Sequence, residues 1–176
     1  DFVYVGDVIR ANILAAESDL LLTKALVSCA PDITAKASGV DNISVNPTVI
    51  IRNITTKVEI ARTPSERTQG LSKRNSLEEG WGMLFVFDEP AIPTFWMEDM
   101  RFPIDILWIS PDNRLSGIIH SAQPEPTDRK GEPNVYRPPG LVSYVLELKA
   151  NTAKRNNFAI GNMVQMKGVT LETERL

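Results

Sequence analysis

Two apolar runs that flank a proline-rich connection are the feature that most constrains the fold of this chain. Residues 83–87 and 104–109 have the length and composition of buried strands. The connection between them contains Pro90, Pro93 and Pro103, each of which fixes backbone φ and cannot donate a hydrogen bond to a strand ladder. The stretch therefore predicts two core strands joined by a rigid loop.

Within this loop, residues of two kinds alternate. Phe95 and Met97 alternate with Trp96 and Glu98, and in an extended segment successive side chains point to opposite sides. We expect the first pair to fill the core and the second pair to face a rim, although a Trp between Phe and Met is as often a core residue. The candidate ligand-binding residues are Trp96, Glu98, Asp99, Arg101, Asp105 and Tyr136.

The acids near Trp96 allow two interpretations. Two carboxylates at a suitable separation could act as acid and base or hold a hard cation. Asp99 and Asp105 could instead stabilise the loop by accepting backbone hydrogen bonds, which is a common role of acids in turns and the one that we favour. If Glu147 and Arg67 are buried, we expect them to pair with each other.

The composition excludes several functional classes. The 176 residues carry a net charge of -3, which gives no electrostatic reason to expect nucleic acid or an anionic membrane as a partner. Cys29 and His120 are single examples of their residue types, which excludes an intramolecular disulfide, a zinc–thiolate site and a cluster of imidazoles. The sequence has no glycine-rich phosphate loop. We therefore predict no cofactor and no bound metal.

The chain divides into an arm and a domain. Residues 1–47 predict an N-terminal helical arm and linker, because apolar residues between 8 and 28 recur near helical spacing and are followed by a polar segment. We favour packing of this helix on its own domain over docking of residues 1–30 on a neighbouring subunit, which would build a homo-oligomer. Residues 48–176 form the second part.

This second part predicts a β-rich domain. Thr63, Pro64 and Glu66 together make a helix start with a capping box, so we expect a short helix from 64 to about 73. About seven short strands and one or two small helices predict an α+β fold with a small antiparallel or mixed sheet, or a barrel. The strands are expected at residues 49–51, 56–61, 83–87, 104–109, 114–121, 142–148 and 162–167.

Several blocks of residues resemble the DUF192 (UPF0127) family in order and spacing. They are residues 58–61, 66–67 with 70–71, 82–87, 95–97, 103–106 and 144–147. The resemblance covers residues 48–167 and leaves residues 1–47 outside. It implies a compact β-rich fold of bacteria and archaea, often behind a leader or membrane anchor, and no established activity. Glu98 stands where the family usually has Lys or Arg, so a role that needs a cation beside Trp96 is not expected.

Three functions are compatible with this sequence. The first is a non-enzymatic module that binds a small ligand, glycan or protein partner at the cell envelope, in a groove between residues 88–103 and 122–141. The second is a carboxylate-based glycan hydrolase, and the third is a structural subunit that assembles through its N-terminal arm. Because the chain begins at Asp1 without a Met, we expect a mature or trimmed protein of the envelope or a secreted one, with a cytoplasmic location left open.

Overall fold

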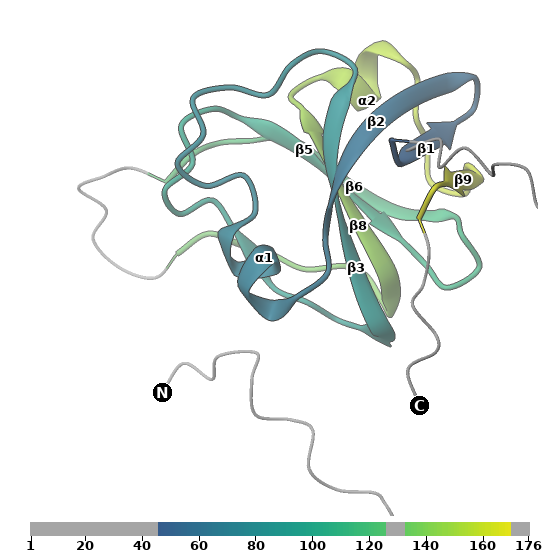
Figure 1. The fold of residues 1–176 in the computed structure, drawn as a ribbon, viewed down its shortest axis with the longest axis horizontal. Helices are drawn as coiled ribbons and strands as arrows, with labels where there is room; N and C mark the ends of the chain where they lie inside the picture. The colour runs from purple at the N-terminus through teal and green to yellow at the C-terminus, as the bar shows by residue number, and fades with distance from the viewer. Residues whose placement is uncertain (1–45, 126–132, 170–176) are drawn as a thin grey trace, which may run out of the picture. The chain divides into compact units, whose positions relative to one another are not determined.

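The structure is a computed structural model that describes residues 46–125 and 133–169. The helical arm expected before residue 46, and with it the contact through residues 1–30, lies outside the described residues. The described part contains a seven-stranded sheet, a two-stranded sheet and two short helices. The larger sheet curls into a half-barrel (Figure 1). The predicted β-rich α+β class is therefore confirmed.

The large sheet has the strand order β6-β5-β8-β3-β2-β1-β9, and β4 pairs with β7 in the small sheet. The elements are β1 (Thr48–Ile51), β2 (Ile54–Ala61), α1 (Pro64–Gln69), β3 (Trp81–Ala91), β4 (Phe95–Trp96), β5 (Ile104–Ile109), β6 (Leu115–Ala122), β7 (Val135–Tyr136), β8 (Val142–Lys149), α2 (Thr152–Arg155) and β9 (Val164–Lys167). In the described segments, neither helix has the length and apolar character required to cross a bilayer.

The seven predicted strands all form, with two differences in detail. Strand β3 continues through Asp88, Glu89 and Pro90 to Ala91, where the sequence predicted a stop after residue 87. An irregularity in the β3–β8 pairing absorbs these residues, and pairing resumes between Ala91 and Val142. The two-residue strands β4 and β7 were not predicted, because two residues are too few to show a periodic pattern.

Strands β2 and β3 are parallel neighbours, so the connection between them must return over one face of the sheet. It contains α1, whose predicted capping box is present: the Thr63 hydroxyl accepts from the Glu66 amide, and the Glu66 carboxylate accepts from the Thr63 amide. The helix ends before Gly70 (φ 47) and not near residue 73. Residues 76–79 also have the residue order of a capping box, but they start no helix, and Leu77 from this segment is buried.

Two hydrophobic clusters lie on opposite faces of the sheet, since neighbouring residues along each strand point to opposite sides. The first core contains Leu84, Leu107 and Leu146. The second core contains Met83 and Trp108 from the sheet, and also Leu71, Leu77 and Met97 from the segments that cover this face. The connection 62–80 and the loop around β4 therefore close one face of the sheet.

Gly82 lies where β3 and β8 approach each other closely. A Cβ atom at this position would lie 2.7 Å from the Glu147 carbonyl oxygen and 2.9 Å from Cδ2 of Leu148. The carbonyl belongs to a strand that is paired on both sides, so it cannot shift freely. We expect Gly82→Ala to lower the free energy of unfolding by about 1–3 kcal/mol, as measured by urea denaturation. Gly140→Ala, whose added Cβ meets no atom within 4 Å, is the control, and equal losses in both variants would contradict this expectation.

Candidate functional site

The structure brings together the two loops that the sequence predicted as walls of a groove. Phe95 of β4 pairs with Tyr136 of β7, and Trp96 pairs with Val135. One step before these pairs, the Arg137 Nε donates to the Thr94 hydroxyl over 3.1 Å. We refer to residues 91–96 and 135–142 as the β4–β7 ribbon.

Phe95 anchors this ribbon in the second core. Its ring packs edge to face against Phe85, at 5.0 Å between centroids, and against Trp108, at 5.4 Å. Met97 on the other side of Trp96 is 1% exposed, whereas Trp96 itself is 50% exposed. The predicted alternation is therefore confirmed, and Trp96 is not a core residue. A half-exposed indole held between two neighbours that pack into the second core presents its ring in a fixed position.

Three other large apolar side chains are exposed on the same ribbon: Ile92, Val135 and Leu141. Val135 is the cross-strand partner of Trp96. Ile92 and Leu141 are the chain neighbours of Ala91 and Val142, which pair with each other. Sequence reasoning missed these three residues. The available signal was an apolar residue within two positions of a proline in each of two loops, which is weak without knowledge that the loops pair.

Charged residues flank the indole. Glu98, Asp99 and Arg101 are all exposed. Asp99 has a left-handed backbone (φ 56), and its carbonyl accepts from the amide of Lys73 over 2.9 Å. The Arg101 guanidinium donates to the side chain of Asn75. These contacts tie the segment after Trp96 to the segment that precedes β3.

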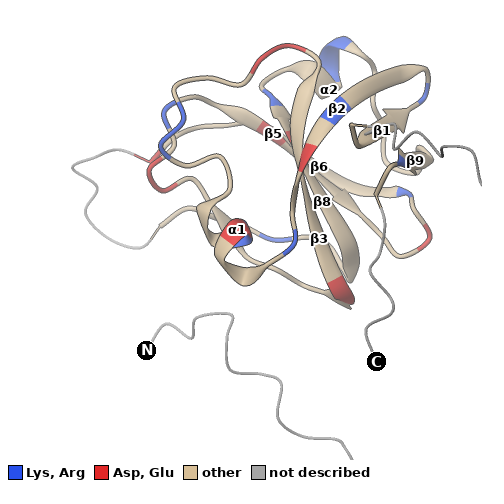
Figure 2. Cartoon of the chain, viewed as in Figure 1, with Lys and Arg blue, Asp and Glu red and all other residues tan. Residues whose placement is uncertain are grey.

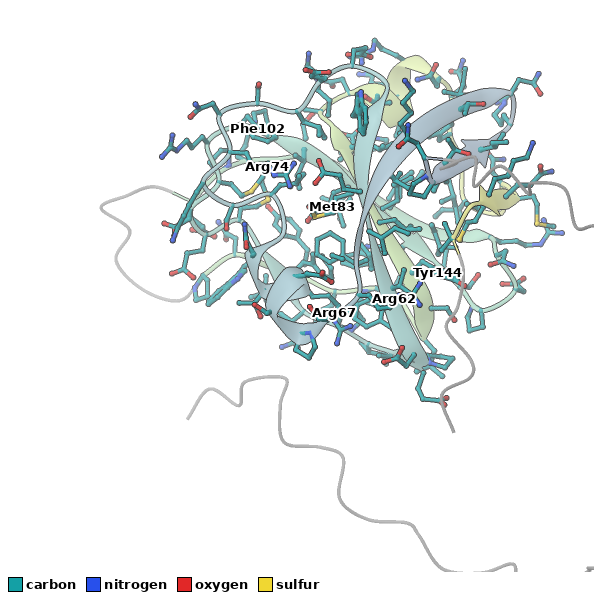
Figure 3. All side chains as sticks on the ribbon, viewed as in Figure 1. Arg62, Arg67, Arg74, Met83, Phe102 and Tyr144 are labelled. Carbon is teal, nitrogen blue, oxygen red and sulfur yellow. The ribbon has the colours of Figure 1, made fainter. Side chains whose placement is uncertain are left out.

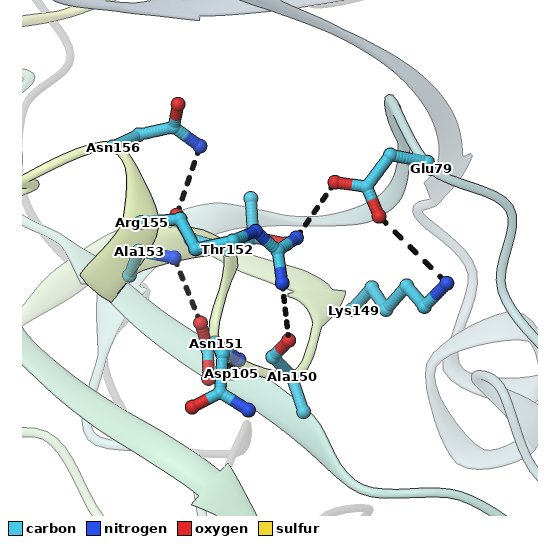
Figure 4. Close-up of polar contacts among 9 residues, drawn as sticks. All are labelled: Glu79, Asp105, Lys149, Ala150, Asn151, Thr152, Ala153, Arg155 and Asn156. Atoms are coloured by element: carbon cyan, nitrogen blue, oxygen red, sulfur yellow. Dashed lines mark hydrogen bonds and ion pairs between the residues drawn. The ribbon is translucent and has the colours of Figure 1, made fainter.

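Tyr136 and Asp105 lie apart from the exposed face of Trp96. Tyr136 is opposite Phe95 and packs, partly buried, against the second core. Asp105 is fully buried, and its carboxylate accepts from the amides of Ser121 (2.9 Å), Asn151 (3.0 Å) and Ala153 (2.8 Å). Figure 4 shows this carboxylate at the start of α2. We therefore leave Asp105 out of the ligand-contacting surface.

A row of side chains that sequence reasoning did not assemble lies under the covering segments. Glu59, Met83, Glu147 and Ile106 are successive cross-strand partners on β2, β3, β8 and β5, so their side chains share one face. Arg74 lies over this face and binds the Glu59 carboxylate with both terminal nitrogens, at 2.6 and 2.7 Å. Figure 3 shows Arg74 on the side of the sheet that carries Met83.

Glu147 is the unusual member of this row. Its residue is 6% exposed, and its Oε2 atom is buried without a hydrogen-bond partner in the structure. Burial raises the pKa of Glu147 to about 8, against a smaller opposing effect of the Arg74 charge. The hydrogen bonds from Arg74 hold the pKa of Glu59 below its usual value. The two carboxyl groups of the row are thus held in different protonation states near neutral pH.

The expected pair of Glu147 and Arg67 does not form. Arg67 donates to the carbonyl oxygens of Arg62 and Val86, and its guanidinium lies 5.3 Å from the Phe87 ring centroid. Carbonyl oxygens before α1 and on β3 therefore bind this guanidinium, and the cation whose charge acts on Glu147 is Arg74. Figure 3 shows Arg62 and Arg67 near α1, away from Arg74.

Charges of both signs are distributed over several elements of the described part (Figure 2). Within residues 46–125 and 133–169, no group of three or more His, Cys, Asp or Glu side chains could hold a metal ion. The features that could act on another molecule are therefore the apolar β4–β7 ribbon with its flanking charges, and the row of Glu59, Arg74 and Glu147 beneath the covering segments.

One family model matches most of the chain. Residues 48–166 match DUF192, described as "Uncharacterized ACR". A protein of unknown function from Novosphingobium aromaticivorans DSM 12444 is 28% identical over 67% of this chain and 83% of its own, with a TM-score of 0.62. A candidate transcription regulator from Sinorhizobium meliloti 1021 is 30% identical over 72% of this chain and 98% of its own, also with a TM-score of 0.62. No curated protein is significantly similar.

Proposed function

The chain belongs to the DUF192 family, whose function is unknown, and from this premise we propose that it is a non-enzymatic binding module of the cell envelope. The proposed binding surface is the exposed face of the β4–β7 ribbon, with Trp96 as the central contact. The observation that carries the proposal is the half-exposed Trp96 between Phe95, which packs partly buried against the second core, and the buried Met97. Aromatic residues in such positions dominate many binding surfaces.

The partner that fits this ribbon best is an extended protein segment. Ile92, Trp96, Val135 and Leu141 are exposed on two antiparallel segments. Residues 92–96 would cover about 16 Å if fully extended, which is the length of a short peptide. Glu98, Asp99 and Arg101 border this apolar surface, and a polar rim of this kind orients a partner and excludes water. A small sugar would cover the indole and leave the other apolar residues in water.

Two other functions have less support from the geometry. A carboxylate-based hydrolase needs two carboxyl groups that face each other across an open cleft, and Asp105 and Glu147 are both buried. The Sinorhizobium relative is described as a transcription regulator. The same role in this chain would require contact with DNA or with a regulatory partner. The net charge of -3 gives no electrostatic reason to choose DNA.

Replacement of Trp96 is expected to abolish binding and to leave the fold intact. Peptides selected on the full chain from a random displayed library should lose at least about tenfold in affinity for Trp96→Ala, a loss of about 1.4 kcal/mol that is typical of a hot-spot residue. The free energy of unfolding should change little, because the ring is 50% exposed. Isothermal titration calorimetry and urea denaturation measure the two quantities.

Trp81→Ala is the matched control, since Trp81 is half-buried at the start of β3 beside Lys57. It should keep peptide affinity. A glycan array run in parallel tests the other ligand class. If no peptide is selected and glycans bind in a manner that depends on Trp96, the partner is a sugar and not a protein. Peptides that bind wild type and Trp96→Ala equally would refute the proposed surface.

The envelope location is the part of this proposal that rests on the family resemblance alone. The family resemblance implies a domain that often follows a leader or a membrane anchor. Fractionation of cells that produce the full-length protein tests this location. Recovery in the cytoplasmic fraction would exclude it and leave the binding surface unaffected.

A further inference from the structure

The buried carboxyl of Glu147 is not accounted for by the binding surface or by the needs of the fold. Its cross-strand neighbours are Met83 on β3 and Ile106 on β5, which are both apolar. An acid in this position costs free energy unless it is protonated or paired. Its Oε2 atom has no hydrogen-bond partner, and even a neutral carboxyl that is buried without a partner lowers stability.

Arg74 is placed so that two carboxyl groups can compete for it. It lies 2.6 Å from the Glu59 carboxylate, and its charge acts on Glu147 as well. Glu59 and Glu147 are separated by one strand, which corresponds to about 10 Å between their backbones. The side chain of Arg74 is one-third exposed, so it is not locked in place by packing. A change of partner is therefore a change of rotamer and a small shift of its segment.

The segment that carries Arg74 is tied to the segment that follows Trp96. The amide of Lys73 donates to the Asp99 carbonyl over 2.9 Å, and the Lys73 ammonium lies 3.9 Å from the Asp99 carboxylate. The Asn75 side chain accepts from Arg101. These contacts flank Arg74 on both sides, so its displacement is transmitted to residues 99–101.

We propose that the row of Glu59, Arg74 and Glu147 is a proton-operated switch. It sets the position of residues 97–101 and thereby regulates the binding surface of the β4–β7 ribbon. The inference deepens the proposed function and rests on it. The neutral state of Glu147 leaves Arg74 bound to Glu59, which is the arrangement in the structure. Loss of the Glu147 proton to solvent creates a buried carboxylate that draws Arg74 from Glu59 toward the core.

The charged groups on the surrounding elements fit this scheme. Glu59 on β2 faces the same side as Glu147, while Met83 on β3 and Ile106 on β5 contribute no charge. Lys73 and Arg74 come from the segment before β3, and Asp99 and Arg101 come from the loop after β4. Lys73 and Asp99 are exposed and already paired with each other. Arg74 is therefore the cation that responds to ionisation of Glu147.

Methionine methyl groups are probes of this switch. The chain has five Met residues, which can be labelled with ¹³C at the methyl carbon and followed by NMR from pH 6 to 9.5 without any ligand. Met83 lies between the two glutamates, Met97 lies next to Trp96, and Met163 is exposed immediately before β9. We expect the methyl chemical shifts of Met83 and Met97 to change together with a midpoint near pH 8. The chemical shift of Met163 should not change.

Two variants separate the steps of the switch. Glu147→Gln should abolish both shifts, because the side chain keeps its shape and cannot ionise. Glu59→Gln, which frees Arg74 to approach Glu147, should lower the midpoint of both shifts and keeps the test available if Glu147→Gln does not fold. A Met83 shift without a Met97 shift would refute the coupling, and no Met83 shift would refute the titration itself. Because no ligand is present, these outcomes are independent of the loss of peptide binding in Trp96→Ala.

Discussion

A rise in pH from about 5 to about 8 is expected to lower the free energy of unfolding of this protein by about 3–5 kcal/mol, at about 1.4 kcal/mol per pH unit for one proton. The cause is Glu147, whose pKa burial raises from 4.5 to about 8. Between these values the folded protein holds a proton that the unfolded chain has released. Stability is therefore greatest near the acidic end of this window and levels off above pH 8.

Urea denaturation at a series of pH values measures this dependence. Glu147→Gln should make the free energy of unfolding nearly independent of pH in the window, and the variant should be more stable than wild type at pH 8.5. The low pKa of Glu59 produces a dependence of opposite sign, but only below about pH 5. A flat profile for wild type, or the same slope in Glu147→Gln, would show that Glu147 is ionised in the folded protein.

Removal of the Asp105 carboxylate is the substitution with the largest expected effect. Asp105→Ala should lower the free energy of unfolding by about 3–5 kcal/mol, because hydrogen bonds to a charged acceptor contribute about 1.5–3 kcal/mol and buried donors are left unpaired. The three amides that lose their acceptor belong to Ser121, Asn151 and Ala153. Two of these residues, Ser121 (φ 50) and Asn151 (φ 66), are in the left-handed region, where a hydrogen bond compensates for backbone strain.

The control for this substitution is Asp88→Ala, because Asp88 is exposed and does not have a left-handed backbone, so loss of its carboxylate should cost less than about 1 kcal/mol. Chemical denaturation of both variants at one pH gives the comparison. Near-equal stability of Asp105→Ala and wild type would mean that the main chain around α2 finds other partners. The N-cap of α2, Asn151, makes no side-chain hydrogen bond of its own, which makes this outcome unexpected.

Local chemistry predicted those parts of the fold that depend on neighbours in the sequence. The Thr63–Glu66 capping box defines the start of α1, and the alternation of Phe95, Trp96 and Met97 assigns each side chain to core or solvent. Both patterns act over three or four residues. The strands β3 and β5 were predicted for the same reason, since a run of consecutive apolar residues indicates a buried strand.

Most of the site could not be predicted because it depends on register between distant strands. The alignment of Glu59, Met83 and Glu147 requires the pairing of β2, β3 and β8, and a one-residue slip would move each side chain to the other face. The same is true of Trp96 and Val135. Arg74 and Arg67 are equivalent candidates for Glu147 in the sequence, and the path of the connection from β2 to β3 selects Arg74.

The central position of β8 has a consequence for synthesis of the protein. This strand lies between β3 and β5 in the sheet, and it is translated after both of them. A nascent chain that has emerged only as far as β6 therefore contains two separate pieces of sheet, each with an unpaired apolar edge that chaperones can bind. The body of the protein can close only when residues 142–149 leave the ribosome, and β1 must wait longer still for β9.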